Sequence, residues 1–462
     1  MKENKIPEKY SFIILIITLI SIMTCVIFNI FLFYGFLASI IFTLVILRKV
    51  SFSTMKLLDI IKQGINEYKS LFLLVSLIGA MISIWMASGV VPIMLYLGLK
   101  YMQNTNFLLA SFILTSIIAI FMGSSFGTVS TIGITLLGLA KVFSVPEYIL
   151  LGAIVSGAFI ADKASPLSTS LILTMETANI NFRNMMKSIL QTLFPTFILS
   201  GLVYYLMGNS YAISVSTFEV DNFISALNST FVISPILLLL PISIIVMSFL
   251  GVKMIKAMSL AIIAGAIVSV VVQGANFPDM IVAIVNGHSI NTDSQQLNTI
   301  LVSGGMLSMI PVILIIAGAT SMSNLFQQTN LMNPIIKRLT SGIQSKGELI
   351  LKTGLISGFL TLISDQSVGI ILPGKLLSSK YEEFGIDNSI LARTIADTGI
   401  VISPLIPWNV NSLFILSTTG ILTTEYAPYA VLCYLSPLIT FILGFIYDFY
   451  SRKMRHKWDM NQ

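Results

Sequence analysis

The stretch AFIADKASPLSTS, from Ala158 to Ser170, places charges, a proline and several hydroxyl groups inside an apolar region of the chain. Asp162 and Lys163 are adjacent, and Pro166 follows them. Proline lacks the backbone N–H of a helical residue and disrupts the preceding turn, which leaves carbonyl groups without partners. Within a membrane, such backbone is tolerated only where it is buried in protein or lines a wet cavity. If the chain spans a membrane, this stretch predicts a helix that is interrupted in the protein interior.

The composition predicts an integral membrane protein. Of the 462 residues, 55% are hydrophobic and 10% are charged, whereas soluble domains carry about 25% charged residues. Mean hydropathy is +0.92. Apolar runs near the 17 to 25 residues needed to cross about 30 Å of hydrocarbon recur from residues 12–28 to residues 429–446. We therefore predict an all-α polytopic protein, which excludes a soluble enzyme with a single anchor.

Basic residues indicate how the chain crosses the membrane, because short loops rich in Lys and Arg stay cytoplasmic. They cluster near Lys2 and Lys5, between Arg48 and Lys69, and around Lys337, among other places, whereas residues 208–230 and 274–298 contain none. This pattern predicts about ten transmembrane helices and a cell-membrane protein with both termini in the cytoplasm. Residues 106–143 and 347–380 are then two re-entrant hairpins. The net charge of +6 reflects this topology rather than a nucleic-acid partner.

A weak internal repeat divides the chain. Ser165-Pro166-Leu167 recurs as Ser403-Pro404-Leu405, 238 positions later, and the same offset places Thr128 on Gln366. The basic-loop rule gives the two copies opposite directions, so we predict inverted repeats with discontinuous helices, as in many secondary transporters. The predicted units are an N-terminal hairpin with a cytoplasmic amphipathic helix (1–69), a first repeat (70–230), connecting scaffold helices (231–307), a second repeat (308–450) and a basic tail (451–462).

Three aspartates lie in the polar breaks that interrupt the apolar segments at residues 123–131, 161–170, 363–369 and 396–409: Asp162, Asp365 and Asp397. Each would cost about 2.5 to 3.5 kcal/mol at the centre of a lipid-exposed helix, so we expect all three to face the interior. Small residues in such breaks can also serve only to bring helices close together. Four breaks at related positions, all with polar groups, favour a binding site instead.

Carboxylate, hydroxyl and carbonyl oxygens together can coordinate a hard cation, and a desolvated carboxyl can take up a proton instead. Asp162 and Asp365 are the first candidates to hold Na⁺ or H⁺, and Asp397 is the third. The further candidate ligands are Ser165, Thr128, Gln366, Ser403 and Asn409, and the supporting candidates are Lys163, Arg393, Pro166, Pro404 and Trp408.

Two of these residues also have a structural interpretation. Arg393 precedes Asp397 by four residues, a helical spacing that favours an ion pair between them. Trp408 suits either a cavity wall or an anchor at the membrane interface, and its closeness to the fourth break favours the wall.

The breaks resemble those of NhaC-type Na⁺/H⁺ antiporters of the ion transporter superfamily. The resemblance spans roughly residues 70–450 and rests on GTVSTIGITLLGLA from Gly127, SGAFIADKASPLSTS from Ser156, SDQSVGIILPGKL from Ser364 and ARTIADTGIVISPLIPWN from Ala392. It implies electrochemically driven exchange of Na⁺ for H⁺, or in some members of a carboxylate or amino-acid substrate, with no ATP and no cofactor. It carries site roles onto Asp162, Asp365, Gln366, Arg393 and Asp397. Family members often read SPLSD where this chain has Thr169, which removes one candidate ligand.

Other activities stay open at this point. The missing carboxylate allows an exchanger of a small organic substrate, a hydroxy acid such as malate or lactate or an amino acid, with Asn409, Gln366 and Arg393 as contacts. An intramembrane hydrolase is disfavoured, because no GxGD or H-E-x-x-H pattern is present and the histidines are only His288 and His456. A channel is disfavoured by the repeat and the resemblance. A homodimer in the lipid bilayer is a candidate assembly.

Overall fold

A computed structural model describes residues 6–459 apart from residues 29, 51, 104, 212–216, 291–297, 299, 333, 335, 337 and 339–341, and it describes no side chains for residues 217–219 and 449–459. Lys2, Lys5 and Lys337, and residues 460–462 of the predicted tail, lie outside the described residues. Within this part of the chain the regular structure is helical throughout. The predicted all-α class is confirmed.

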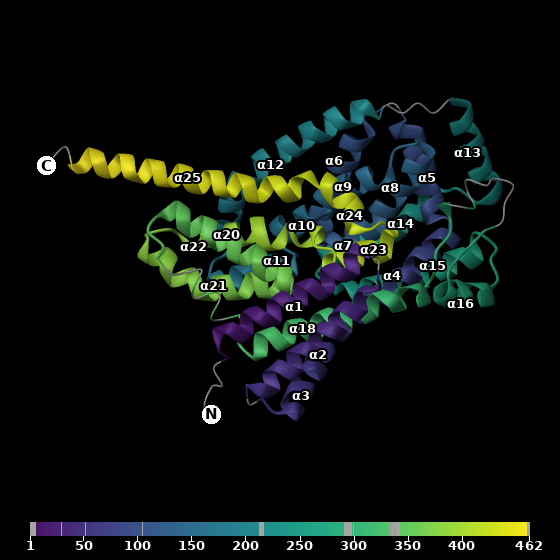
Figure 1. Ribbon diagram of the computed structural model, residues 1–462. Coiled ribbons are helices and arrows are strands. Elements are labelled where there is room, and N and C mark those ends of the chain that lie inside the picture. The colour runs from purple at the N-terminus through teal and green to yellow at the C-terminus, as the bar shows by residue number, and fades with distance from the viewer. Residues whose placement is uncertain are drawn as a thin grey trace.

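The N-terminal helices follow the prediction for residues 1–69. Helices α1 (Glu8–Ile27) and α2 (Leu32–Lys49) form a hairpin, and α3 (Thr54–Glu67) is the amphipathic helix. Leu57 and Ile60 of α3 are buried while its charged residues are exposed, because its apolar side chains share one face. This face packs on α18 (Ile310–Gln328). The four helices lie together at one side of the molecule, away from the C-terminal helix (Figure 1).

The half of the chain that follows α3 contains two of the predicted breaks, at residues 123–131 and 161–170. Its elements are α4 (Lys69–Ala87), α5 (Val90–Met102), α6 (Phe107–Met122), α7 (Ser125–Thr128), the π-helical η1 (Val129–Gly133), α8 (Ile134–Val142), α9 (Glu147–Ala158), α10 (Ile160–Ala164), α11 (Thr169–Ala178) and α12 (Phe182–Ser210). Gly123, with φ of 66°, ends α6, and Ser124 caps α7 by accepting a hydrogen bond from the backbone of Gly127. The polar break 123–131 thus reverses the chain.

The second half repeats this order after a connecting region. The connection contains α13 (Thr217–Thr230), η2 (Pro235–Leu238), α14 (Leu239–Phe249), α15 (Met254–Val271), α16 (Phe277–Asn286) and η3 (Leu307–Met309). After α18 follow α20 (Lys346–Ile363), α21 (Gln366–Glu383), α22 (Asn388–Ile395), the π-helical η4 (Ala396–Ile400), η5 (Ser403–Leu405), α23 (Val410–Thr419), α24 (Thr423–Tyr426), η6 (Ala427–Tyr429) and α25 (Val431–Asp459).

The offset of 238 residues relates these elements. Helices α6, α9 and α11 begin at residues 107, 147 and 169, and their counterparts α20, α22 and α23 begin at 346, 388 and 410, within three residues of the shifted positions. Each half therefore contains a helical hairpin, a broken helix and a long helix in the same order. The opposite directions of the halves in the membrane rest on the distribution of basic loops.

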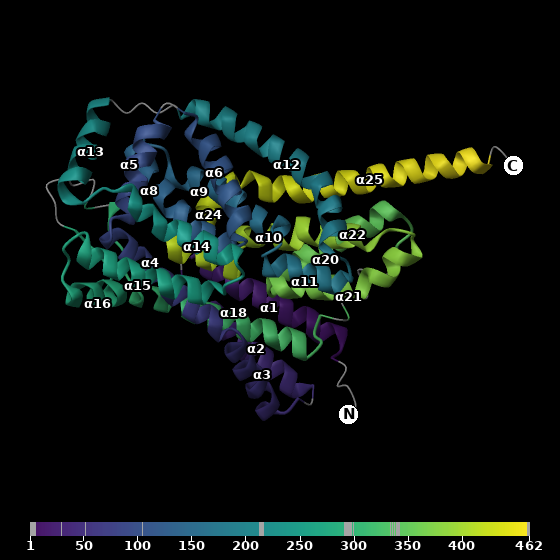
Figure 2. The same ribbon diagram turned by 180° about the vertical axis from the view of Figure 1, so that it is seen from behind.

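The helix lengths fit the predicted number of spans. Eight helices among the described residues are long and apolar enough to cross a membrane, or up to eleven if each bent pair forms one span. Two bent pairs coincide with predicted breaks: Glu147–Ala164 with Thr169–Ala178, bent by 40°, and Asn388–Leu405 with Val410–Thr419, bent by 43°. The protein is therefore a multi-pass membrane protein with discontinuous helices. The second view shows α10 between the long helices α12 and α25 on one side and α1 and α18 on the other (Figure 2).

Candidate functional site

Asp162 lies at the end of the first broken helix, where the backbone leaves the helical path. Ser165 ends α10 with extended backbone angles, and Ser168 caps the next helix, α11, by accepting a hydrogen bond from the backbone of Leu171. The hydroxyl of Ser165 donates to the carbonyl of Ile120 at 2.9 Å. Pro166 lies between these two caps and is exposed. The break therefore consists of a short unwound stretch whose polar groups are satisfied locally.

The carboxylate of Asp162 is 9% exposed and accepts a hydrogen bond from the Ser125 hydroxyl at 2.6 Å. It borders a cavity of about 460 Å³, which we call the Asp162 cavity. Its polar lining includes Ser124, Ser125, Thr169, Ser170, Gln366 and Asn411. These residues come from all four predicted breaks or from the helices that follow them. The four breaks therefore converge around this cavity.

Asp365 occupies a different position. It caps α21, where its carboxylate accepts hydrogen bonds from the Ser367 backbone at 3.0 Å and from the Tyr68 hydroxyl at 2.9 Å. The side chain is buried and is not part of the lining of the Asp162 cavity, whereas the next residue, Gln366, is. The structure therefore does not bring Asp162 and Asp365 together as ligands in one cavity, and each has its own hydroxyl partner.

Asp397 is fully buried and paired across the repeat. Its carboxylate accepts hydrogen bonds from Lys163 at 2.5 Å, Ser436 at 2.9 Å and Thr440 at 2.6 Å. Lys163 also donates to Ser436 at 2.8 Å. These four side chains, which we call the Lys163–Asp397 cluster, have 0% exposure. Because all the ligands of the carboxylate come from the protein, Asp397 acts here as a link between α10 and η4.

The prediction of an ion pair between Arg393 and Asp397 is wrong. Asp397 lies in the π-helical segment η4, where backbone bonds run from i to i+5, so side chains four apart no longer share one face. Arg393 instead donates to Gln191 at 2.7 Å from a fully buried position. Asp397 finds its cation in Lys163, the residue next to Asp162.

A group of amides and hydroxyls joins the third and fourth polar breaks, both in the C-terminal half. Asn411 donates to Gln366 at 3.2 Å, to Ser403 at 2.9 Å and to Asn409 at 3.1 Å. Asn409 caps α23 and donates to the carbonyl of Thr361 at 3.3 Å. Of these four residues, Gln366 and Asn411 line the Asp162 cavity. Asn409 and Ser403 do not line the cavity but accept hydrogen bonds from Asn411 and so orient its side chain.

Three further candidates contact other parts of the protein and do not line the Asp162 cavity. Thr128 donates to the carbonyl of Ser124 at 2.9 Å, and its side chain is buried. Trp408 is 7% exposed and donates from its indole nitrogen to the carbonyl of Leu362 at 2.6 Å, so it packs inside the protein and does not line the Asp162 cavity. The carbonyl of Pro404 accepts a hydrogen bond from Tyr426 at 2.6 Å.

The site also contains residues that the sequence analysis did not single out. Ser125 was inside a quoted break, and Asn411 is two residues beyond another, so both could have been found by extending the search along the breaks. Ser436 and Thr440 are hydroxyl residues four apart on an otherwise apolar helix, which is a signal for a polar face. Tyr68 carried no such signal.

Comparison with known proteins agrees with these observations. A family model described as the Na⁺/H⁺ antiporter family matches residues 177–446. The chain is 31% identical over 392 residues to the Na(+)/H(+) antiporter NhaC of Alkalihalophilus pseudofirmus, with 84% of each chain covered. It is 29% identical to the Na(+)/H(+) antiporter NhaC of Bacillus subtilis, covering 84% of this chain and 86% of the relative. It is also 29% identical to the Malate-2H(+)/Na(+)-lactate antiporter of Bacillus subtilis, covering 86% and 85%. The chain therefore belongs to the Na⁺/H⁺ antiporter family.

Proposed function

We propose that this protein exchanges Na⁺ for H⁺ across the cell membrane by alternating access, with the carboxylate of Asp162 holding one cation at a time. One observation supports this role above the others: Asp162 is buried within the membrane-spanning part and borders a cavity lined by hydroxyl and amide groups. Both termini face the cytoplasm in this proposal, in keeping with the distribution of basic loops.

The groups around Asp162 suit a hard monovalent cation, which prefers oxygen ligands. Ser125 donates to the Asp162 carboxylate and can turn its hydroxyl lone pairs toward a cation instead. Gln366 and Asn411 also line the cavity, and their side-chain carbonyls are further neutral oxygens that can turn toward a cation. Because Na⁺ and a proton neutralise the same carboxylate, occupation by one excludes the other. This competition is the simplest basis for exchange.

Asp365 takes a secondary role in this proposal. Its carboxylate is held by Tyr68 and by the start of α21, so a cation would have to displace the Tyr68 hydroxyl to reach it. Gln366, its neighbour in sequence, lines the Asp162 cavity, which makes Asp365 a residue that positions α21 beside the cation. Asp397 serves as an internal partner of Lys163.

A second candidate is exchange of a small carboxylate. Lys253 is among the residues that line the Asp162 cavity, and its ammonium group suits an organic anion. One relative is named a malate-2H(+)/Na(+)-lactate antiporter, which makes hydroxy acids the first compounds to test.

Transport by the purified protein in liposomes tests both candidates. We expect an imposed Na⁺ gradient to drive H⁺ movement in the native protein, and we expect Asp162→Asn to reduce this flux at least 100-fold because the neutral amide cannot exchange a proton. Asp221→Asn, which removes an exposed carboxylate, is the control and should transport normally. Full exchange by Asp162→Asn would overturn the proposed role. Gradient-driven uptake of labelled malate or lactate without Na⁺-driven H⁺ flux would favour the second candidate.

A further inference from the structure

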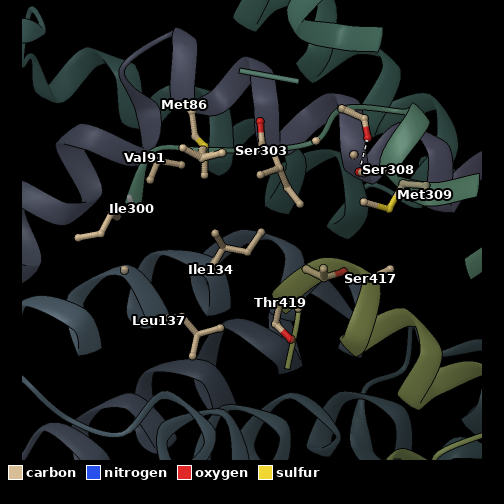
Figure 3. Close-up of a pocket in the computed structure, with 18 of the residues that line it drawn as sticks. Met86, Val91, Ile134, Leu137, Ile300, Ser303, Ser308, Met309, Ser417 and Thr419 are labelled. Atoms are coloured by element: carbon tan, nitrogen blue, oxygen red, sulfur yellow. Dashed lines mark hydrogen bonds between the residues drawn. The ribbon is translucent and has the colours of Figure 1, made fainter. Parts of the chain in front are cut away.

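A second cavity, of about 320 Å³, lies between α4 and α5 on one side and α8 and the end of α23 on the other. Figure 3 shows its two walls: Met86, Val91 and Ser303 on one side, and Ile134, Leu137 and Thr419 on the other. The first wall consists of α4, α5 and the segment before η3, and the second consists of α8 and the end of α23. We call this space the second cavity. It is distinct from the Asp162 cavity, with which it shares no lining residue.

Hydroxyl groups make the second cavity suitable for water and small cations. Ser303, Ser308, Ser417, Thr418 and Thr419 contribute to its lining. At its rim, the ammonium of Lys141 and the carboxylate of Glu147 are 3.9 Å apart, and both side chains are more than one third exposed. A weak exposed pair of this kind contributes little to stability. Glu147 therefore presents a carboxylate oxygen to the surrounding water beside the ammonium group of Lys141.

The two cavities lie at opposite ends of the same helices. In α4, Leu71 and Leu74 line the Asp162 cavity, whereas Gly79, Ile82 and Met86 line the second cavity. Since an α-helix rises 1.5 Å per residue, Leu74 and Gly79 are only about 7.5 Å apart along the axis. The layer that separates the cavities is therefore thin.

Two further elements repeat this relation. In α23, Asn411 lines the Asp162 cavity and residues 417–419 line the second cavity. In the segment from α7 to α8, residues 124–126 line the first and Ile134, Leu137 and Lys141 line the second. Three elements from distant parts of the sequence thus connect the same two spaces, and α23 contacts both α4 and α7.

An aromatic pair lies in the layer between the cavities. The rings of Phe126 and Phe414 are stacked with their centroids 4.0 Å apart and an angle of 12° between their planes. Val75 and Ile78 of α4, on the stretch between the two cavities, are fully buried. A hydrated ion cannot cross a packed apolar layer without a rearrangement, because it would lose its water ligands there.

We propose that the second cavity is the other half of the ion pathway, an entrance for a hydrated monovalent cation on the membrane face opposite to the Asp162 cavity, and that the Phe126–Phe414 stack closes the pathway between them. This inference rests on the proposed transport function, because it assumes that ions move to and from Asp162. It adds the route from the second face and the residues that separate the two sides.

Access to single cysteines tests the two faces. In a variant with Cys25 and Cys433 replaced by alanine, Ser170→Cys reports on the Asp162 cavity and Ser417→Cys on the second cavity. Thr105→Cys is the matched control. Thr105 is exposed just before α6, and Phe107 at the start of α6 packs on Phe143 just beyond α8. Thr105 should therefore lie on the same face as the second cavity, which α8 lines. We expect an impermeant maleimide to label Ser417→Cys and Thr105→Cys from one face and Ser170→Cys from the other.

Modification of Ser417→Cys should also reduce transport at least tenfold, whereas modification of Thr105→Cys should not. The inference would be overturned if Ser417→Cys and Ser170→Cys were labelled from the same face, or if Ser417→Cys were not labelled at all. Labelling from opposite faces in a protein that shows no Na⁺/H⁺ exchange would support the pathway and overturn the proposed substrates. The two proposals therefore fail in different ways.

The aromatic layer has its own test. Removing one ring by Phe414→Ala or Phe126→Ala should raise the passive H⁺ leak of proteoliposomes at least tenfold, because water can then enter the layer. Phe445→Ala, which removes an exposed ring from α25, is the control. A leak in both ring variants no larger than that of Phe445→Ala would refute the role of the stack.

Discussion

The Lys163–Asp397 cluster provides a quantitative test of the packing between the repeats. The variant Lys163→Met removes the cation and leaves the Asp397 carboxylate with Ser436 and Thr440 in a site with 0% exposure. Removing one partner of a buried ion pair costs about 3 to 5 kcal/mol, because the other charge remains buried and unpaired. We expect a loss of this size for Lys163→Met, and a comparable loss for Asp397→Leu.

The double variant Lys163→Met/Asp397→Leu should be much less destabilised than the two single losses together. Replacing both partners of a buried pair by apolar groups is often neutral. Ser436 and Thr440 then lose an acceptor, but hydroxyl groups on a helix can donate to a carbonyl four residues earlier, as Thr394 does toward Ile390. We therefore expect a loss of about 1 to 2 kcal/mol for the double variant, and a coupling energy of at least about 3 kcal/mol.

Equilibrium unfolding by SDS in mixed micelles measures these four free energies. The control is the same cycle on Glu348 and Lys352, a partly exposed pair with a separation of 2.9 Å and a spacing of four residues. Such pairs contribute about 0.3 to 0.5 kcal/mol. A coupling energy for Lys163 and Asp397 below about 1 kcal/mol, or similar to that of the control pair, would refute the view that this cluster holds the repeats together.

Two further predictions concern the surroundings of Asp365 and the connection between α21 and α22. Tyr68→Phe removes the hydroxyl that donates to Asp365. It should shift the pH dependence of transport while the protein remains folded. An unchanged pH profile of Na⁺-driven H⁺ flux would exclude a link between Tyr68 and transport. Hydrogen bonds from Ser389 hold the pKa of the exposed Asp387 below its usual 3.8. The ionised carboxylate caps α22, so it stabilises the protein above pH 3.8, and this stabilisation is lost as the pH falls through the lowered pKa. The native protein should therefore lose a small advantage over Asp387→Ala in thermal unfolding between pH 5 and about pH 3, and a constant difference over this range would contradict the assignment.

Local patterns in the sequence were sufficient to predict the helices and their breaks, and the buried position of Asp162. The amphipathic helix predicted within residues 1–69 is α3, and Pro166 predicted the break after α10. The apolar surroundings of Asp162 required an interior position, because a carboxylate facing lipid is costly. These predictions depend only on neighbours within a few turns of helix.

The partners of the charged residues could not be predicted in this way. Lys163 and Asp397 are 234 residues apart, and Tyr68 and Asp365 are 297 apart, so only the three-dimensional packing brings them together. The spacing of Arg393 and Asp397 was misleading because the π-helical turn of η4 rotates the later side chain away. A single sequence shows which groups need partners but not which distant groups supply them.

The adjacency of Asp162 and Lys163 has a mechanical consequence. Lys163 fastens the end of α10 to η4 in the other repeat through a buried ion pair, and Asp162 is the next residue along the backbone. A shift of α10 relative to η4 would separate Lys163 from Asp397 inside the protein. Both charges would then be buried and unpaired, and this separation would cost as much free energy as removing one partner. The two broken helices must therefore move as one unit, with Asp162 fixed between them. In the alternating-access cycle that we propose, this unit moves against α4 and the segment before η3, which form the facing wall of the second cavity.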